Sequence, residues 1–91
     1  MTPVRSEIRY DVVSRLRSVA GHLKAVERMV EEDKYCVDVM KQTMAIEKAL
    51  ERIDTVILEE HLATCVADSF RQGRSDRTVK ELAEIFSTAR K

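Results

Sequence analysis

Apolar residues recur at helical spacing along the first third of the chain. They follow one another in alternating steps of four and three residues: Val12, Leu16, Val19, Leu23, Val26 and Val30. Such a repeat is typical of helices that pack along one another through a continuous seam. It predicts a first long helix over about residues 5–32. Gly21, inside this segment, lowers helix propensity by about 1 kcal/mol relative to alanine but does not end the pattern.

A second long segment has apolar residues on more than one helical face. These residues are Val37, Met40, Met44, Ile46, Leu50, Ile53, Val56, Ile57, Leu62, Val66 and Phe70. The segment holds neither glycine nor proline, and Asp33 is a suitable N-cap just before it. The pattern predicts a second helix over about residues 34–71 that is buried against several neighbours.

A short third helix is predicted at the carboxyl end. Gly73 is expected to close the second helix, and Ser75 or Asp76 to cap a helix over about residues 76–89. Its inward-facing residues are expected to be Val79, Leu82, Ala83 and Phe86. The predicted fold is therefore all-α, with two long helices and a short one in a single domain spanning residues 1–91.

The length of the second helix bears on how the chain assembles. A helix of about 35–38 residues spans about 50–57 Å, whereas a compact globule of this size is only about 30 Å across. The second helix would extend beyond any core that one chain can form and would leave apolar faces uncovered. We therefore expect a helical oligomer. The alternative is a monomer whose second helix is bent or broken.

Composition agrees with a helical chain and narrows its location. Of the 91 residues, 44% are hydrophobic and 35% charged, with only 2 Gly, 1 Pro and no Trp. No apolar run approaches the roughly 18–20 residues needed to cross a membrane. The segment "MTPVRSEIRYD" lacks the apolar core of a signal peptide, so we expect a cytoplasmic protein with reduced thiols.

The stretch "EEHLATC" at residues 59–65 suggests a metal site. It places His61 and Cys65 four residues apart, on the same face of the expected helix. Cys36, the other cysteine, lies about 37 Å away along a continuous helix, so the three side chains cannot meet within one chain. An antiparallel second helix from another chain would bring them together.

The donor set favours one metal. Two thiolates and one imidazole suit Cu(I) in a low-coordinate site, whereas structural zinc usually has four protein ligands. Cys36 lies near the amino end of the second helix, where the amide dipoles favour thiolate. Two alternatives stay open: buried cysteines with an ordinary histidine, and a reversible interchain disulfide between Cys36 and Cys65.

Basic residues form stripes along both long helices, although the net charge is zero, with 16 Lys and Arg against 16 Asp and Glu. The candidates for DNA contact are Arg15, Arg17, Lys24, Lys41, Lys48 and Arg52. Duplicated in an oligomer, these stripes would offer an extended surface to phosphates. The alternative is a solvated surface in which Glu27, Glu47 and Glu51 pair with them. No catalytic motif is present, so an enzyme is not expected.

Three segments resemble a known family of repressors. "RLRSVAGHLKAVERMVEEDKYC" at 15–36, "YCVDVMKQ" at 35–42 and "HLATC" at 61–65 resemble the copper-sensing branch of the CsoR/RcnR family, from Arg15 to Phe86. The resemblance implies an antiparallel four-helix-bundle dimer that pairs into a dimer of dimers. It also implies a repressor that binds operator DNA when metal-free and releases it on binding Cu(I), derepressing copper-resistance genes.

The same resemblance implies roles for individual residues. Cys36 of one protomer would bind Cu(I) together with His61 and Cys65 of the partner subunit. Tyr35 and Glu81 would form the outer shell, and a carboxylate hydrogen-bonded to a metal-bound His61 would couple metal loading to the third helix.

Arg15 and Arg52 match positions that contact DNA in the family. The main rival is a thiol-redox or persulfide-responsive repressor that uses Cys36 and Cys65, for which an imidazole at His61 is not needed. A cytosolic copper-buffering protein without a DNA role is the rival of another class.

Overall fold

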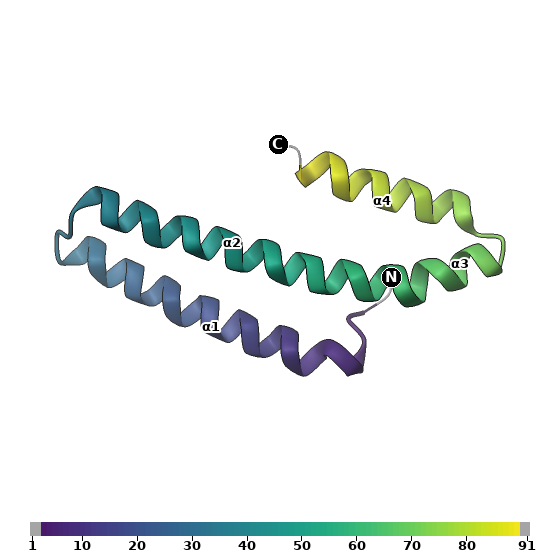
Figure 1. Cartoon of the computed structure of the whole chain (residues 1–91), viewed down its shortest axis with the longest axis horizontal. Coiled ribbons are helices and arrows are strands. Elements are labelled where there is room, and N and C mark those ends of the chain that lie inside the picture. The colour runs from purple at the N-terminus through teal and green to yellow at the C-terminus, as the bar shows by residue number, and fades with distance from the viewer. Residues whose placement is uncertain (1–2, 90–91) are drawn as a thin grey trace. The chain divides into compact units, whose positions relative to one another are not determined.

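The structure, a computed structural model, describes residues 3–89 apart from the side chain of Cys65. Every element in this part of the chain is helical, which confirms the all-α prediction. In chain order the elements are α1 (Ser6–Glu31), α2 (Cys36–His61), the π-helical η1 (Leu62–Val66), α3 (Ala67–Arg71) and α4 (Ser75–Ala89) (Figure 1). They form two compact units, Pro3–Leu58 and the residues from Glu59 onward. No described helix is both long and apolar enough to span a membrane.

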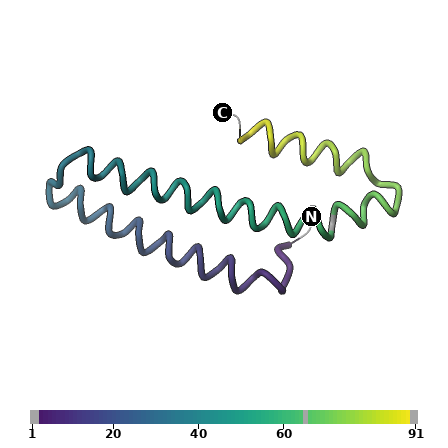
Figure 2. The backbone as a smooth tube through the Cα atoms, viewed as in Figure 1, coloured from purple at the N-terminus to yellow at the C-terminus, as the bar shows by residue number. Residues whose placement is uncertain are grey.

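In the first unit, α1 lies antiparallel to α2, as the backbone trace in Figure 2 shows. The buried side chains are Val12 and Val26 from α1 and Ile46 and Ile53 from α2. A polar contact joins the same two helices, since a ring nitrogen of His22 lies 2.7 Å from Oε1 of Gln42. The amphipathic pattern therefore packs one helix against the other over several turns.

The apolar seam of α1 separates into two rows of residues seven apart. Val12, Val19 and Val26 form the inner row, in which Val12 and Val26 are each 5% exposed and Val19 is half-buried. Leu16, Leu23 and Val30 form the outer row and are 45%, 54% and 58% exposed. On α2, a further set of large apolar side chains is also exposed: Val37, Met40, Met44 and Leu50. Within one chain, only half of the seam is covered.

Asp33 ends α1 rather than capping α2, so the predicted N-cap is wrong. Its φ of 58° lies in the left-handed region, which a short polar side chain tolerates. The Asp33 amide donates to the Val30 carbonyl at 3.1 Å, and the Lys34 amide donates to the Met29 carbonyl at 3.0 Å. These two bonds make a Schellman motif, which satisfies the last carbonyls of α1.

The second long helix begins at Cys36, two residues later than predicted. Its first turn is closed by the Val39 amide, which donates to the Tyr35 carbonyl at 3.2 Å. Tyr35 therefore precedes the helix and takes the position expected of Asp33. The difference arises because the Schellman motif uses the residues up to Lys34 to end α1.

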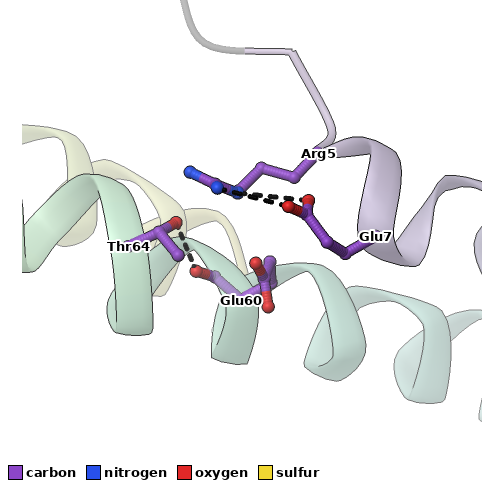
Figure 3. Close-up of polar contacts among 4 residues, drawn as sticks. All are labelled: Arg5, Glu7, Glu60 and Thr64. Atoms are coloured by element: carbon purple, nitrogen blue, oxygen red, sulfur yellow. Dashed lines mark hydrogen bonds and ion pairs between the residues drawn. The ribbon is translucent and has the colours of Figure 1, made fainter.

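The predicted helix over 34–71 is not a uniform α-helix. A π-helical segment, Leu62–Val66, separates α2 from α3. The Thr64 hydroxyl donates to the Glu60 carbonyl at 2.8 Å (Figure 3). That carbonyl is the acceptor that an α-helix would give to the Thr64 amide, so the side chain competes with the regular ladder. The helical direction continues to Arg71, but with a wider turn in this segment.

Gly73 ends the helical segment, as predicted, with a φ of 75°. The Gly73 amide donates to the Phe70 carbonyl at 3.3 Å, and the Arg74 amide donates to the Ser69 carbonyl at 2.8 Å. This is a second Schellman motif, here with glycine in the left-handed position. Helix α4 then begins at Ser75.

Most of the residues expected to face inward on the last helix are exposed in the single chain. Val79 and Phe86 are 54% and 56% exposed, Ala83 is exposed, and Leu82 is half-buried. The buried residue of α4 is Thr78, which is 6% exposed. The periodicity identified the amphipathic face correctly, but the partner that would cover it does not come from this chain's own α3.

At its amino end, α1 carries a short-range ion pair. Two nitrogens of the Arg5 guanidinium each lie 3.4 Å from a Glu7 carboxylate oxygen (Figure 3). The Glu7 carboxylate also accepts a hydrogen bond from its own backbone amide. This bond, first, and the Arg5 guanidinium, second, hold the pKa of Glu7 below its usual value.

Candidate functional site

Cys36 occupies the first position of α2. Its thiol is free and exposed. The first-turn amides of a helix lack intrahelical acceptors and point toward this end, so an electron-rich sulfur is well placed here. The position agrees with the prediction that Cys36 lies near the start of the second helix, and its exposure leaves the sulfur accessible to a ligand or to another chain.

His61 is the last residue of α2 and is half-buried. Cys65 follows within the π-helical segment, and the prediction about its side chain lies outside the described residues. Position 65 is therefore reached through a π turn rather than through the regular α-helix that the sequence suggested. Such single turns are frequent at functional sites. The side-chain geometry of the His61–Cys65 pair stays a prediction.

No break interrupts α2 between Cys36 and His61. With a rise of about 1.5 Å per residue, about 37 Å of helix separates the two residues. Among the described side chains, no three of the types His, Cys, Asp and Glu lie close enough together to hold a metal ion. A continuous α2 therefore keeps Cys36 apart from His61 of the same chain.

The two predicted outer-shell residues lie on different elements. Tyr35 precedes α2 and is 66% exposed. Glu81 lies on α4, where its carboxylate is 3.4 Å from Nε of Arg77. Both side chains of this ion pair are substantially exposed, so the pair restrains Glu81 only weakly. The predicted hydrogen bond between Glu81 and a metal-bound His61 stays a prediction.

The six basic candidates lie on α1 and α2. Arg15 is half-buried, and its Nε donates to the two carboxylate oxygens of Asp11 at 3.1 and 3.2 Å. The other five are exposed: Arg17, Lys24, Lys41, Lys48 and Arg52. Within residues 3–89, the recorded ion pairs join none of these five to Glu27, Glu47 or Glu51. Both interpretations of these stripes, a solvated surface and a DNA-binding surface, stay predictions.

Two polar contacts were missed by the sequence analysis. The first is the bond between His22 and Gln42, whose residues are 20 positions apart. The second joins Ser69 and Thr78 across the turn between α3 and α4. Thr78 lies one turn before Leu82 at the edge of the apolar face of α4, and a polar residue there gives little sign that it is buried. Only the path of the chain brings either pair together.

The chain matches the family described as "Metal-sensitive transcriptional repressor" over residues 9–88. It is 43% identical over 72 residues to the copper-sensing transcriptional repressor CsoR of Mycobacterium bovis (strain BCG / Pasteur 1173P2), which is 79% of this chain and 60% of that protein. It is 33% identical over 75 residues to the copper-sensing transcriptional repressor CsoR of Bacillus subtilis (strain 168), covering 82% and 74% of the two chains.

A solved structure has the same fold. The crystal structure of the copper-sensing repressor CsoR with Cu(I) from Geobacillus thermodenitrificans NG80-2 superposes with a TM-score of 0.91 at 32% identity. The superposition covers 100% of this chain and 95% of that one. The matched region is only about 60% of the length of the mycobacterial relative.

Proposed function

Because the chain belongs to the family of metal-sensitive transcriptional repressors, we propose that it is a copper(I)-responsive repressor, which binds operator DNA when metal-free and releases it on Cu(I) binding, derepressing copper-resistance genes. The observation that carries the proposal is the donor set. An exposed, free thiol at Cys36 begins α2, and an imidazole at His61 ends it. Cys65, four residues further on, completes two sulfurs and one nitrogen, a set suited to Cu(I).

In the proposed site, Cys36 of one protomer acts with His61 and Cys65 of the partner subunit. Bound Cu(I) would supply a soft, low-coordinate centre that joins the two protomers. The second ring nitrogen of His61 would donate to a carboxylate or another acceptor, which fixes the tautomer of the ring. Glu81 and Tyr35 are the proposed outer-shell residues. Because the site needs reduced thiols, the proposed location is the cytoplasm.

We propose a homodimer that pairs into a homotetramer. The outer row of α1 and the exposed apolar residues of α2 support this assembly, since Leu23, Val30 and Met40 are each more than half exposed in the single chain. A second antiparallel α1–α2 pair would cover them and complete a four-helix bundle. The same arrangement places the start of one α2 beside the end of the other, as the shared metal site requires.

Arg15, Arg17, Lys24, Lys41, Lys48 and Arg52 form the proposed DNA-binding surface. Five of them are exposed and unpaired with the glutamates of their own helices. Contacts of lysine and arginine with phosphates make affinity fall steeply as salt rises. Sequence preference would then come from DNA shape together with the base contacts that the arginines make.

Regulation follows from linkage between the two ligands. Copper releases DNA only if it binds more tightly to the conformation that binds DNA poorly, and DNA then weakens copper binding by the same factor. A coupling free energy of about 2–3 kcal/mol corresponds to a change of about 30–150-fold in DNA affinity. A change of that size is sufficient for a genetic switch.

The decisive experiment measures binding to the protein's own promoter region without oxygen, with and without one Cu(I) per chain. Cys36→Ser replaces the soft sulfur by a hard oxygen of similar size, and Ser14→Ala on α1 serves as a control. The wild type and the control should lose DNA affinity on copper addition, whereas Cys36→Ser should not. A full copper response in Cys36→Ser would refute the ligand assignment.

A thiol-based switch through Cys36 and Cys65 is the second candidate, because the Cys36 thiol is free and exposed. The variant His61→Ala separates the two functions. If copper is the inducer, the variant loses the copper response. If an oxidant or a persulfide is the inducer, the variant keeps its response to that reagent. A copper-buffering protein would show no salt-sensitive, copper-reversible DNA binding in the wild type.

A further inference from the structure

Ser69 fixes the backbone at the turn between α3 and α4. Its hydroxyl donates to the Arg74 carbonyl at 2.9 Å, while the Arg74 amide donates to the Ser69 carbonyl at 2.8 Å. Ser69 thus holds both the amide and the carbonyl of Arg74. The Ser69 side chain therefore stabilises this turn in addition to the Schellman motif at Gly73.

Thr78 connects this turn to α4. It is the buried polar side chain of the described residues, at 6% exposure, and its hydroxyl is hydrogen-bonded to the Ser69 hydroxyl. Each hydroxyl has one proton. The Ser69 and Thr78 hydroxyls lie 2.9 and 3.4 Å from the Arg74 carbonyl oxygen, so either hydroxyl can donate to that carbonyl while the other donates between the pair. Because the bond between the two hydroxyls joins a residue of α3 to a residue of α4, it restricts how α4 can lie against α3.

The position of this pair relates it to the candidate site. Ser69 lies one helical turn after position 65, and Thr78 lies three residues before Glu81, on the same side of α4. All of these residues belong to the compact unit that begins at Glu59. The Ser69–Thr78 pair therefore joins α3, which directly follows the segment with Cys65, to α4, which carries Glu81.

We propose that the hydroxyl clamp, formed by Ser69 and Thr78, is a positioning element that transmits metal binding at the His61–Cys65 segment to α4. This inference rests on the proposed function and deepens it by naming a route of regulation. A change at one site shifts another only through an element whose arrangement both sites bias. A directional hydrogen bond between the half-buried Ser69 hydroxyl and the buried Thr78 hydroxyl makes α3 and α4 move together, whereas apolar contacts alone would let them slide.

Two substitutions at one position test the clamp. Thr78→Val keeps the shape of the side chain and removes the hydroxyl, and Ser69 keeps its bond to Arg74. Thr78→Ser retains the hydroxyl and removes only a methyl group. Thr88→Val is the matched control on the same helix, because the Thr88 hydroxyl is exposed and donates only to the Glu84 carbonyl, at 3.0 Å.

The readout is the copper-dependent change in DNA affinity, measured without oxygen and with one Cu(I) per chain. We expect that ratio to fall at least fivefold in Thr78→Val and to stay within twofold of the wild type in Thr78→Ser and Thr88→Val. Copper affinity and metal-free DNA affinity should stay within twofold of the wild type in all three variants. A residue with a purely structural role would lower stability without changing this ratio selectively.

An independent measurement follows amide hydrogen exchange in α4 before and after copper addition. Copper should change the exchange of α4 in the wild type and in Thr78→Ser, but not in Thr78→Val. If Thr78→Val fails to fold, as judged by circular dichroism, Ser69→Ala replaces it and should show the same loss of response.

The outcomes separate the two hypotheses. An unchanged copper response in Thr78→Val, or in Ser69→Ala where that replaces it, overturns the clamp and leaves the proposed function standing. A wild type whose DNA affinity does not respond to copper overturns the proposed function, and the clamp with it. Rescue by Thr78→Ser, together with loss in Thr78→Val, supports the clamp.

Discussion

The inner and outer rows of α1 have similar residues and different surroundings. Both consist of valine or leucine at intervals of seven, yet Val12 and Val26 are 5% exposed whereas Leu23 and Val30 are 54% and 58% exposed. Hydrophobicity does not explain the difference, because leucine is no less apolar than valine. The inner row packs against α2, whereas the described residues leave about half of each outer-row side chain exposed. One heptad pattern thus contains a row that the chain covers and a row that it leaves exposed, and the exposed row is the surface that we propose for pairing between subunits.

A charge in the outer row should have the largest effect. Leu23→Glu is expected to dissociate the proposed oligomer into folded monomers and to abolish the proposed copper response, because a carboxylate buried between helices without a partner is strongly unfavourable. Sedimentation would measure the mass, and circular dichroism the helix content. Lys24→Glu, at a neighbouring exposed position, is the control for charge and should keep the oligomer. An intact oligomer in Leu23→Glu would refute the role given to the outer row.

Shortening a side chain that is buried between α1 and α2 should lower the stability of the single chain rather than weaken the contact between subunits. Ile53→Ala is expected to lower the free energy of unfolding by about 2–4 kcal/mol, because it opens a cavity between α1 and α2. Leu50→Ala, at a residue that is 41% exposed in the single chain, is the matched variant. The loss of unfolding free energy in Leu50→Ala should depend on protein concentration, as expected for a contact between subunits. Chemical denaturation at two protein concentrations distinguishes the two cases.

The polar contact between the two long helices should contribute less. Gln42→Ala removes the partner of the half-buried His22 ring and is expected to cost about 1 kcal/mol, since water can replace part of the lost bond. Gln72→Ala, at an exposed position in the α3–α4 turn, is the control. A loss in Gln42→Ala no greater than in the control would show that the contact does not fix the register of α1 against α2.

The smallest expected change in stability lies in the turn that joins the two long helices, and it is a gain rather than a loss. Asp33→Gly is expected to stabilise the protein by about 0.5 kcal/mol, because glycine adopts the left-handed conformation without the penalty of a Cβ atom. Gly73→Ala, at the other Schellman motif, should destabilise the protein by about 1 kcal/mol for the same reason. Thermal unfolding of both variants would test the comparison, and equal shifts of the same sign would contradict it.

The sequence predicted the features that depend on local pattern. The alternating four-and-three spacing located α1, and the absence of glycine and proline located the long helical segment that starts at Cys36. Gly73 was correctly identified as the end of that segment, because few residues other than glycine accept a left-handed conformation. Asp33 was misassigned, since aspartate suits both an N-cap and a left-handed position, and the residue alone does not distinguish them.

The candidate site was predictable in its residue types and not in its local geometry. Soft donors at Cys36, His61 and Cys65 were visible as a chemical set. The π-helical turn at Leu62–Val66 was not, because it depends on how one hydroxyl and the neighbouring backbone share their hydrogen bonds. The burial of Thr78 was missed for a related reason. Its partner Ser69 lies across a turn, and periodicity describes only neighbours along one helix.

By itself, the sequence determined where helices form, where they end at glycine, and which side chains offer sulfur and nitrogen to a metal. These properties follow from backbone propensity, spacing and side-chain chemistry, all of which act within a few residues. The tertiary structure decided which apolar row of α1 is covered and that Thr78 is buried. Burial is set by contacts between residues distant in the chain, so it emerges only once the helices are packed.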